Sequence, residues 1–281
     1  MLKLASDDIV LHVLPDRGGG LMKFEAFGRQ VLRPGKGLAP HPTELAGFVL
    51  VPFCNRIADG RLPGHTPLKP NLPKEPHAIH GEGWHARWKI AEESANAALL
   101  SLDYVPSPGR WPWAFSATQE FRLEGQKFHH TLSVTNQAQE PTPAGLGFHP
   151  YFSYRRGDLL KASIKGVWES DEARLPNRHV LIDDEKYWPR GRIDEAATLD
   201  HCFTGWDGQL QITRRDITIQ VTTSGNLPFL HIYAPAGEAF VCLEPVSHVP
   251  NALNLMDAPP MTRLMPGETL SASLTYDVSL T

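Results

Sequence analysis

The chain has 281 residues and a formal net charge of −4 at pH 7. Without a basic stripe, this mild acidity makes nucleic acid and anionic membranes poor partners. The cysteines Cys54, Cys202 and Cys242 are odd in number and widely spaced, which argues against a disulfide framework and favours a reducing compartment. The first residues lack the order of a secretory signal and no apolar run is long enough to span a bilayer, so we expect a cytoplasmic protein.

Alternation of apolar and polar residues with a period of two dominates the chain, and helical periodicity is scarce. Two runs, 229–234 and 239–244, are almost wholly apolar and predict strands buried on both faces. Turn residues at 124–126 and 214–215 predict hairpins. In chain order, the predicted strands are 9–14, 21–27, 97–105, 116–123, 128–135, 209–213, 216–223, 229–234, 239–244 and 268–278.

Two segments depart from this pattern. Residues 34–53 are apolar and interrupted by proline, with one helical turn expected at 43–47. Residues 157–191 carry scattered charges and prolines, and we expect them to run irregularly over the surface. Many short strands with few helices predict an all-β fold, a large antiparallel sandwich or barrel. Since no linker or repeat is evident, residues 1–281 are predicted to form a single domain.

A histidine and a glutamate each precede a proline in runs that predict strands: His149 before Pro150, and Glu244 before Pro245. Proline cannot donate to a strand ladder and biases the preceding residue toward an extended conformation. Both residues are therefore expected at strand ends, where a side chain can enter a cleft. Histidine and carboxylate are the commonest general acid and base groups, although either one taken alone is as often structural.

Other polar residues cluster outside the strands. Asn55 and Arg56 follow an apolar run and offer donors and acceptors for a ligand with several hydroxyl groups, although a solvated surface turn is the simpler interpretation. Asp200 lies where a strand is predicted to begin. Its carboxylate suits paired hydroxyl groups, but it also suits the cap of a turn.

The stretch 76–88 concentrates three histidines and two tryptophans. Trp84 and Trp88 present flat apolar faces that suit the C–H face of a sugar ring. His77, His80 and His85 are also candidate metal ligands, but their spacing matches no compact metal motif.

Five motifs follow one another in a fixed order. They are Pro52-Phe53-Cys54-Asn55-Arg56-Ile57 with Gly60, His80-Gly81 with Trp88, Gly147-Phe148-His149-Pro150-Tyr151-Phe152, Asp200-His201-Cys202-Phe203, and Leu243-Glu244-Pro245 with Pro250-Asn251-Ala252-Leu253-Asn254. Together they resemble the aldose 1-epimerase (galactose mutarotase) family over nearly the whole chain. This resemblance implies a large antiparallel β-sandwich with a sugar cleft across one sheet. It also implies that the chain interconverts the α and β anomers of a free aldose without a metal or other cofactor.

The resemblance also implies roles for individual residues. Glu244 matches the general base that takes the proton from the C1 hydroxyl, and His149 matches the general acid that protonates the ring oxygen. Arg56, His80 and Asp200 match residues that hold sugar hydroxyls, and Asn55 matches a neighbour of the same kind. The implied partner is a small-molecule sugar, and the sequence is compatible with a monomer or a homodimer.

Three alternatives stay open. One is a hexose-6-phosphate 1-epimerase, because His85-Ala86-Arg87 is similar to a motif of those enzymes; Arg61 or Arg87 would then bind the phosphate. Another is a non-catalytic carbohydrate-binding β-sandwich that uses the tryptophans and Asn55-Arg56 for recognition only. The last is a metal-dependent β-barrel enzyme built on the three histidines of 76–88.

Overall fold

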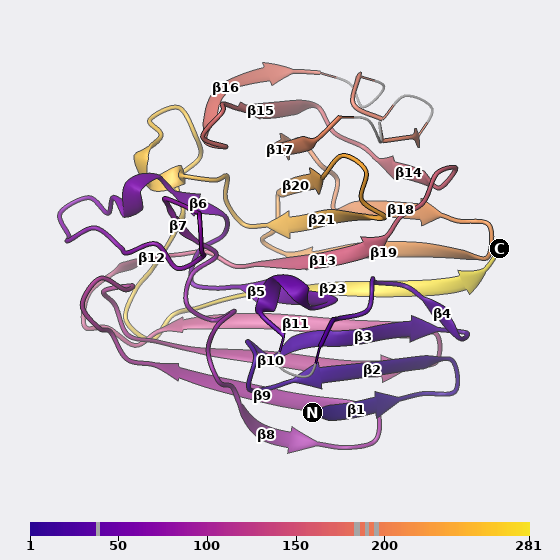
Figure 1. The fold of residues 1–281 in the computed structure, drawn as a ribbon. Coiled ribbons are helices and arrows are strands. Elements are labelled where there is room, and N and C mark those ends of the chain that lie inside the picture. Colours follow the sequence, from indigo (N-terminus) through magenta and orange to yellow (C-terminus); the bar gives the residue numbers. More distant parts are fainter. Residues whose placement is uncertain (38–39, 183–185, 189–190, 194–196) are drawn as a thin grey trace.

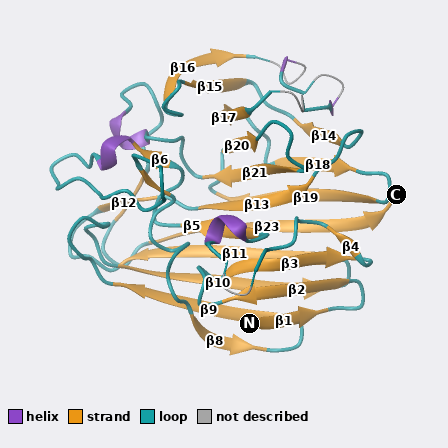
Figure 2. Cartoon of the chain, in the orientation of Figure 1, coloured by secondary structure: helices purple, strands orange, loops and turns teal. Residues whose placement is uncertain are grey.

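The structure is a computed structural model that describes all residues except 38–39, 183–185, 189–190 and 194–196. Strands make up most of the regular structure, and Figure 2 shows them as the dominant elements. Three single 3-10 turns lie wholly within the described residues: η1 (Pro42–Glu44), η2 (Ala58–Gly60) and η5 (Ala252–Asn254). In the part of the chain that is described, no helix has the length and apolar character that crossing a membrane requires.

The larger of two main sheets has 11 strands in the order β1-β2-β3-β5-β13-β21-β20-β17-β15-β16, with β4 beside β3 (Figure 1). Its strands are β1 (Leu2–Ala5), β2 (Ile9–Leu14), β3 (Gly20–Ala26), β4 (Arg29–Gln30), β5 (Gly47–Leu50), β13 (Gly147–Ser153), β15 (Gly166–Ser170), β16 (Pro176–Leu181), β17 (Leu199–Thr204), β20 (Phe229–Ala234) and β21 (Phe240–Val246). The strands β13, β21 and β20 lie side by side near its centre, although they come from distant parts of the chain.

The smaller main sheet has eight strands in the order β14-β18-β19-β23-β11-β10-β9-β8. These are β8 (Lys89–Glu93), β9 (Ala97–Tyr104), β10 (Phe115–Glu124), β11 (Lys127–Asn136), β14 (Leu159–Ala162), β18 (Gln209–Thr213), β19 (Ile217–Gly225) and β23 (Thr269–Leu280). Two small ribbons complete the fold: β6 (Arg56–Ile57) pairs with β7 (Ala78–Ile79), and β12 (Thr142–Ala144) with β22 (Thr262–Leu264).

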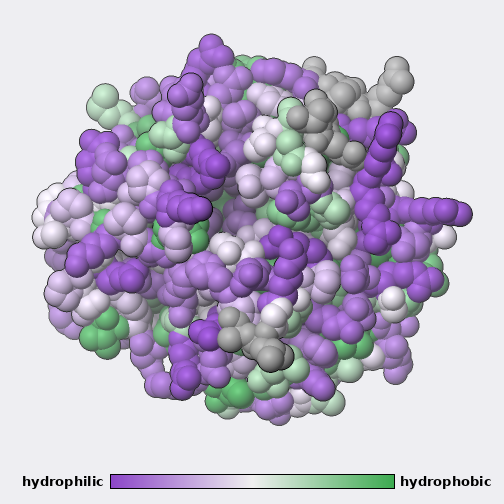
Figure 3. All heavy atoms as spheres, viewed as in Figure 1, coloured by the Kyte–Doolittle hydropathy of each residue, from purple (hydrophilic) through white to green (hydrophobic). Residues whose placement is uncertain are grey.

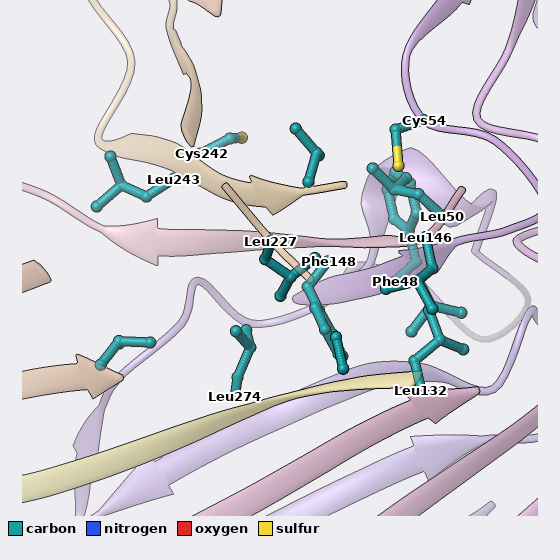
Figure 4. Packing of buried hydrophobic residues seen from close by; sticks show 14 of the residues in the cluster. Phe48, Leu50, Cys54, Leu132, Leu146, Phe148, Leu227, Cys242, Leu243 and Leu274 are labelled. Carbon is teal, nitrogen blue, oxygen red and sulfur yellow. The ribbon is translucent and has the colours of Figure 1, made fainter. Parts of the chain in front are cut away.

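Aromatic side chains fill the space between the two main sheets. Phe24 of the larger sheet meets Phe128 and Tyr276 of the smaller one edge-on, with ring centroids 5.2 and 5.3 Å apart. Figure 4 shows Phe148 and Leu243 on one side of this core, and Leu132 and Leu274 on the other. In contrast, hydrophilic residues cover most of the surface in view in Figure 3. Burial of this apolar layer is the main force that holds the two sheets together.

Alternation along β13 decides which of its side chains leave this core. Phe148 and Phe152 point toward the smaller sheet, where they meet His130 and Tyr276. Because successive side chains of a strand point to opposite faces, His149 lies on the other face of the larger sheet.

The all-β antiparallel prediction is confirmed, and each predicted strand is present within a few residues of its expected ends. The prediction for residues 157–191 is wrong over most of its described part. Three strands, β14, β15 and β16, lie in this segment, and β16 forms the exposed edge of the larger sheet. Charges on their exposed faces conceal the alternation that identifies strands elsewhere. The predicted helical turn at 43–47 begins one residue earlier, at Pro42.

Candidate active site

Strand register places His149 opposite Glu244. The antiparallel pair β13 and β21 aligns Gly147 with Val246, so His149, two residues further on, faces Glu244, two residues back. Directly opposed residues hold their Cβ atoms about 4.5–5.5 Å apart. Accordingly, His149 Nε2 lies 3.1 Å from Glu244 Oε1. Two groups about a hundred residues apart in the chain are thus brought into contact by the fold.

Pro150 and Pro245 interrupt the ladder beside this pair. Neither has an N–H to donate, and no pairing is made between residues 148–150 of β13 and 243–245 of β21. Each proline keeps its register with the strand on its other side. The prediction that His149 and Glu244 lie at strand ends is therefore wrong, because both lie within their strands.

Burial controls the protonation of the pair. Both side chains are almost fully buried, and Glu244 Oε2 and His149 Nδ1 have no hydrogen-bond partner. Burial, helped by the Asp200 carboxylate, raises the pKa of Glu244 well above its ordinary value. Burial likewise lowers the pKa of His149 to about 3. Their mutual attraction favours the charged forms, but burial outweighs it because little water reaches either group. Between these two pKa values the pair holds one proton and no net charge.

His231 on β20 extends the polar row from Glu244, which it faces across the β20–β21 ladder. Its Nε2 lies 2.9 Å from Asp200 Oδ1, on the neighbouring strand β17. Burial acts to raise the pKa of Asp200, but the hydrogen bond from His231 and the nearby arginines outweigh it and hold the pKa below its ordinary value. Asp200 is therefore an ionised hydrogen-bond acceptor near neutral pH. As predicted, it lies at the start of a strand.

A buried network positions Arg56 beside this row. Arg56 Nε donates to Glu75 Oε2 at 3.0 Å and Nη1 to Asn55 Oδ1 at 3.2 Å. Arg56 Nη1 is also 4.0 Å from Asp200 Oδ2. His80 Nδ1 accepts from the Asn55 backbone N–H at 3.3 Å, so in its neutral form His80 carries its proton on Nε2. Burial keeps it neutral by lowering its pKa well below the ordinary value.

The backbone around this network is specified by a few residues in left-handed conformations. Asn55 has φ 54°, which asparagine tolerates better than most residues, and Gly81 has φ 73°. A Cβ on Gly81 would lie 2.1 Å from the Val51 carbonyl oxygen. Glycine therefore serves here for close packing of two backbone segments.

A pocket of about 280 Å³ lies against the polar row of His149, Glu244 and His231, and its volume is near the lower end of the range for small-molecule sites. All six site residues predicted from the sequence line it: Asn55, Arg56, His80, His149, Asp200 and Glu244. The sequence analysis missed the rest of the lining, namely Arg33, Thr43, Phe48, Leu72, Ile79, Tyr151, Arg174, His231, Tyr233 and Phe240. Phe48 stacks on the His149 ring with centroids 4.5 Å apart and helps to fix its orientation.

Comparison with known proteins identifies the family. The family model described as aldose 1-epimerase matches residues 2–277. The chain belongs to the aldose 1-epimerase family. It is 30% identical over 278 residues to the uncharacterized protein YphB of Escherichia coli K12, covering 94% of this chain and 93% of that protein. A second relative, the uncharacterized protein YihR of the same organism, is 27% identical over 84% of this chain and 80% of its own length.

Solved structures of aldose 1-epimerase-like proteins share the fold. An Escherichia coli K12 protein provisionally assigned as an aldose 1-epimerase superposes with a TM-score of 0.90 at 27% identity, covering 99% of this chain and 98% of that chain. A galactose mutarotase-like protein from Clostridium acetobutylicum gives a TM-score of 0.84 at 21% identity, covering 99% and 95%. The second comparison supports the sandwich architecture alone.

Within this aldose 1-epimerase fold, the two tryptophans predicted as a sugar platform lie in the core. Trp84 and Trp88 are 0% and 2% exposed, and their indole nitrogens donate to the carbonyl oxygens of Gly81 and Gly83. Neither lines the pocket. Their prediction as sugar contacts is wrong, because the motif's aromatic residues pack beneath the site instead.

The predicted alternative of a metal site on His77, His80 and His85 is not supported by the described residues. Among the described residues, three other candidate donors lie together: His149, Cys242 and Glu244, whose ligand atoms are within 4.8 Å of one another. Burial raises the pKa of the Cys242 thiol well above its ordinary value. Since thiolate is the form that binds metals, this set suits proton transfer better than metal binding.

Proposed function

We propose that this chain is an aldose 1-epimerase that interconverts the α and β anomers of a reducing aldose by opening and closing the sugar ring. The observation that carries the proposal is the contact of 3.1 Å between His149 Nε2 and Glu244 Oε1 in a pocket lined with hydroxyl-binding groups. Family membership supports a carbohydrate epimerase.

The reaction needs one proton removed and one delivered. Ring opening takes the proton from the C1 hydroxyl and adds a proton to the ring oxygen, and both oxygens are bonded to the same carbon. A proton acceptor and donor in contact therefore match the spacing of the reacting atoms. In this proposal Glu244 is the general base and His149 the general acid, in line with the common use of both side chains.

The pair delivers one proton and takes up another. Burial places the one proton of the resting pair on Glu244, and its transfer across the 3.1 Å contact ionises Glu244 and protonates His149. His149 then gives this proton to the ring oxygen as Glu244 takes a second proton from the C1 hydroxyl. Afterwards Glu244 is neutral and His149 is neutral. Burial favours this uncharged arrangement, so it stabilises the open-chain stage of the reaction. Rotation about C1–C2 and the reverse transfers then yield the other anomer.

Asn55, Arg56, His80 and Asp200 are proposed to hold the sugar hydroxyls. Their chemistry is complementary: Asp200 is an ionised acceptor, while the His80 Nε2–H and the Arg56 guanidinium are donors. Fixing the ring between these groups adds an orientation contribution to the rate.

Glu244→Gln tests the proposal. We expect anomer exchange, followed by polarimetry or NMR exchange spectroscopy, to fall about 10²–10⁴-fold while sugar binding persists, because the amide keeps the shape of the side chain but cannot accept the proton. Glu120→Gln, on an exposed position of β10, is the matched control. Near wild-type exchange in the Glu244 variant would remove Glu244 as the base. Sugar binding by a wild-type protein that accelerates no exchange would instead favour the carbohydrate-binding alternative.

A further inference from the structure

We propose that the sugar carries an anionic group at C6 and that Arg33 binds this group. The inference rests on the proposed function, because it uses the placement of the ring oxygen beside His149. It assigns a substrate class, an aldose with a carboxylate, phosphate or sulfonate at C6, to a pocket whose other groups suit any sugar.

Arg33 is held in the pocket wall by three kinds of contact. Its guanidinium carbon lies 3.6 Å from the ring centroid of Tyr151 and 4.3 Å from that of Phe240. Its Nη2 donates to the carbonyl oxygen of Thr43, and its backbone N–H donates to the Tyr151 carbonyl oxygen at 2.8 Å. Arginine stacked on aromatic rings in this way is pre-ordered, so little side-chain freedom is lost when it binds a ligand.

The charges of the pocket leave Arg33 without a carboxylate. Arg56 pairs with Glu75 at 3.0 Å, and Arg174 lies 4.0 Å from Asp200. The His149–Glu244 pair is neutral overall. Among the residues that the structure describes, no carboxylate lies within ion-pair distance of Arg33, and its buried Nε has no hydrogen-bond partner. Arg33 also lines the pocket, and a half-buried guanidinium in a pocket wall without a carboxylate partner is suited to bind an anion.

The position of Arg33 along the sheet matches C6. Tyr151 is two residues beyond His149 on β13, which is about 7 Å along a strand. The Tyr151 and His149 rings lie 4.8 Å apart. C6 is attached to C5, which bonds the ring oxygen. A ring oxygen at His149 therefore lets a C6 substituent extend over Tyr151 toward Arg33.

The arginines predicted from the sequence to bind a phosphate do not reach this place. Arg61 lies 3.6 Å from Asp59 and Arg87 2.9 Å from Asp16, and both are largely exposed. Neither lines the pocket. In this proposal Arg33 binds the anionic group, in place of Arg61 or Arg87 as the sequence predicted.

The test compares D-glucose with its C6 carboxylate, its 6-phosphate and its 6-deoxy-6-sulfonate, by NMR exchange at equilibrium. We expect kcat/KM for at least one anionic sugar to exceed that for glucose by 10-fold or more, and the best anion identifies the source of the charge. Arg33→Gln is expected to reduce that ratio about 10- to 100-fold, mainly through KM, because a charge-assisted contact to the anionic group is lost. For Arg33→Lys we expect a ratio between those of wild type and Arg33→Gln. The matched control is Arg87→Gln, at an exposed position, for which we expect the wild-type ratio.

Other outcomes separate this inference from the proposed function. The anion site would be overturned if kcat/KM for glucose equalled that for every anionic sugar. It would also be overturned if Arg33→Gln lowered kcat/KM equally for all sugars. Both outcomes would leave the proposed mutarotation intact. If the wild-type protein exchanges no anomers, the proposed function fails. Titration calorimetry with the same anionic sugars then still decides the role of Arg33: tighter binding to wild type than to Arg33→Gln supports it, and equal binding overturns it.

Discussion

Two buried histidines, one between the sheets and one in the pocket, have the same pKa shift in different surroundings. Burial lowers the pKa of His130 to about 3, as it does for His149. His130, however, stacks on Phe121 in the core, and its Nε2 lies 3.2 Å from the neutral amide oxygen of Gln119. His149 contacts a carboxylate and lines the pocket.

The difference shows that a shifted pKa alone does not indicate a catalytic group. Both rings are buried, stacked on a phenylalanine and kept neutral. What distinguishes His149 is its contact with the Glu244 carboxyl group and its place in the lining of the pocket. His130 is therefore buried among packing contacts, whereas His149 is buried against a group with which the proposed mechanism shares a proton.

The sharpest test of this contrast is the pair His149→Asn and His130→Asn. For His149→Asn we expect anomer exchange to fall about 10²–10⁴-fold, because the proposed acid is lost. For His130→Asn we expect the free energy of unfolding to fall by about 1–3 kcal/mol, because a buried hydrogen bond is broken, while the rate per folded molecule stays near wild type. Exchange assays and urea denaturation measure the two effects. A comparable rate loss in both variants would break the distinction.

A smaller effect is expected at Asp200. Asp200→Asn keeps the side-chain shape but removes the charge that is proposed to bind sugar hydroxyls. We expect kcat/KM to fall about 10- to 100-fold, mostly through KM, since a hydrogen bond to a charged group contributes more than one to a neutral group. The control is Asp103→Asn on β9, an exposed aspartate that pairs with Lys89. A loss confined to kcat would show that Asp200 acts on the reacting atoms instead.

The smallest effect concerns stability. Because burial raises the pKa of Glu244, the folded protein keeps a proton that the unfolded chain releases once the pH exceeds the ordinary carboxyl value. The stability that Glu244 contributes is therefore present at low pH and lost as the pH rises. Glu244→Gln has no such proton to lose, so we expect its free energy of unfolding to rise relative to that of wild type between about pH 4 and pH 8, by about 1.4 kcal/mol for each unit of pKa shift.

Urea denaturation of Glu244→Gln, Glu120→Gln and wild type at the two pH values measures this difference. The exposed control is expected to follow wild type at both. A stability difference between wild type and Glu244→Gln that is the same at both pH values would contradict a raised pKa of Glu244.

Alternation of apolar and polar residues was sufficient to predict the antiparallel fold. The six predicted residues that line one pocket came from the resemblance of five ordered motifs to the aldose 1-epimerase family. The sequence was insufficient for His231, which lies in the apolar run of β20 and gives no local signal. Only the register of β20 with β21, which aligns it with Glu244, places it at the site.

Arg33 and the two tryptophans show in two ways that the sequence alone does not tell which side chains reach the pocket. Arg33 lines the pocket but was not predicted, whereas the tryptophans were predicted but do not line it. Arg33 lies in a connecting segment, and its role comes from Tyr151 and Phe240, residues more than a hundred positions away. Trp84 and Trp88 stand in a motif-rich stretch, yet their direction is set by packing against the sheet. Residue type predicts what a side chain can do, while tertiary packing determines where it points.

The contact between His149 and Glu244 is fixed by two adjacent strands in the middle of a sheet, whereas Arg33, Asn55 and Arg174 come from segments outside the strands. Connecting segments tolerate insertions and exchanges far better than central strands. Under the proposed function, changes in these connecting segments would therefore alter which sugar is bound while leaving the His149–Glu244 pair in place.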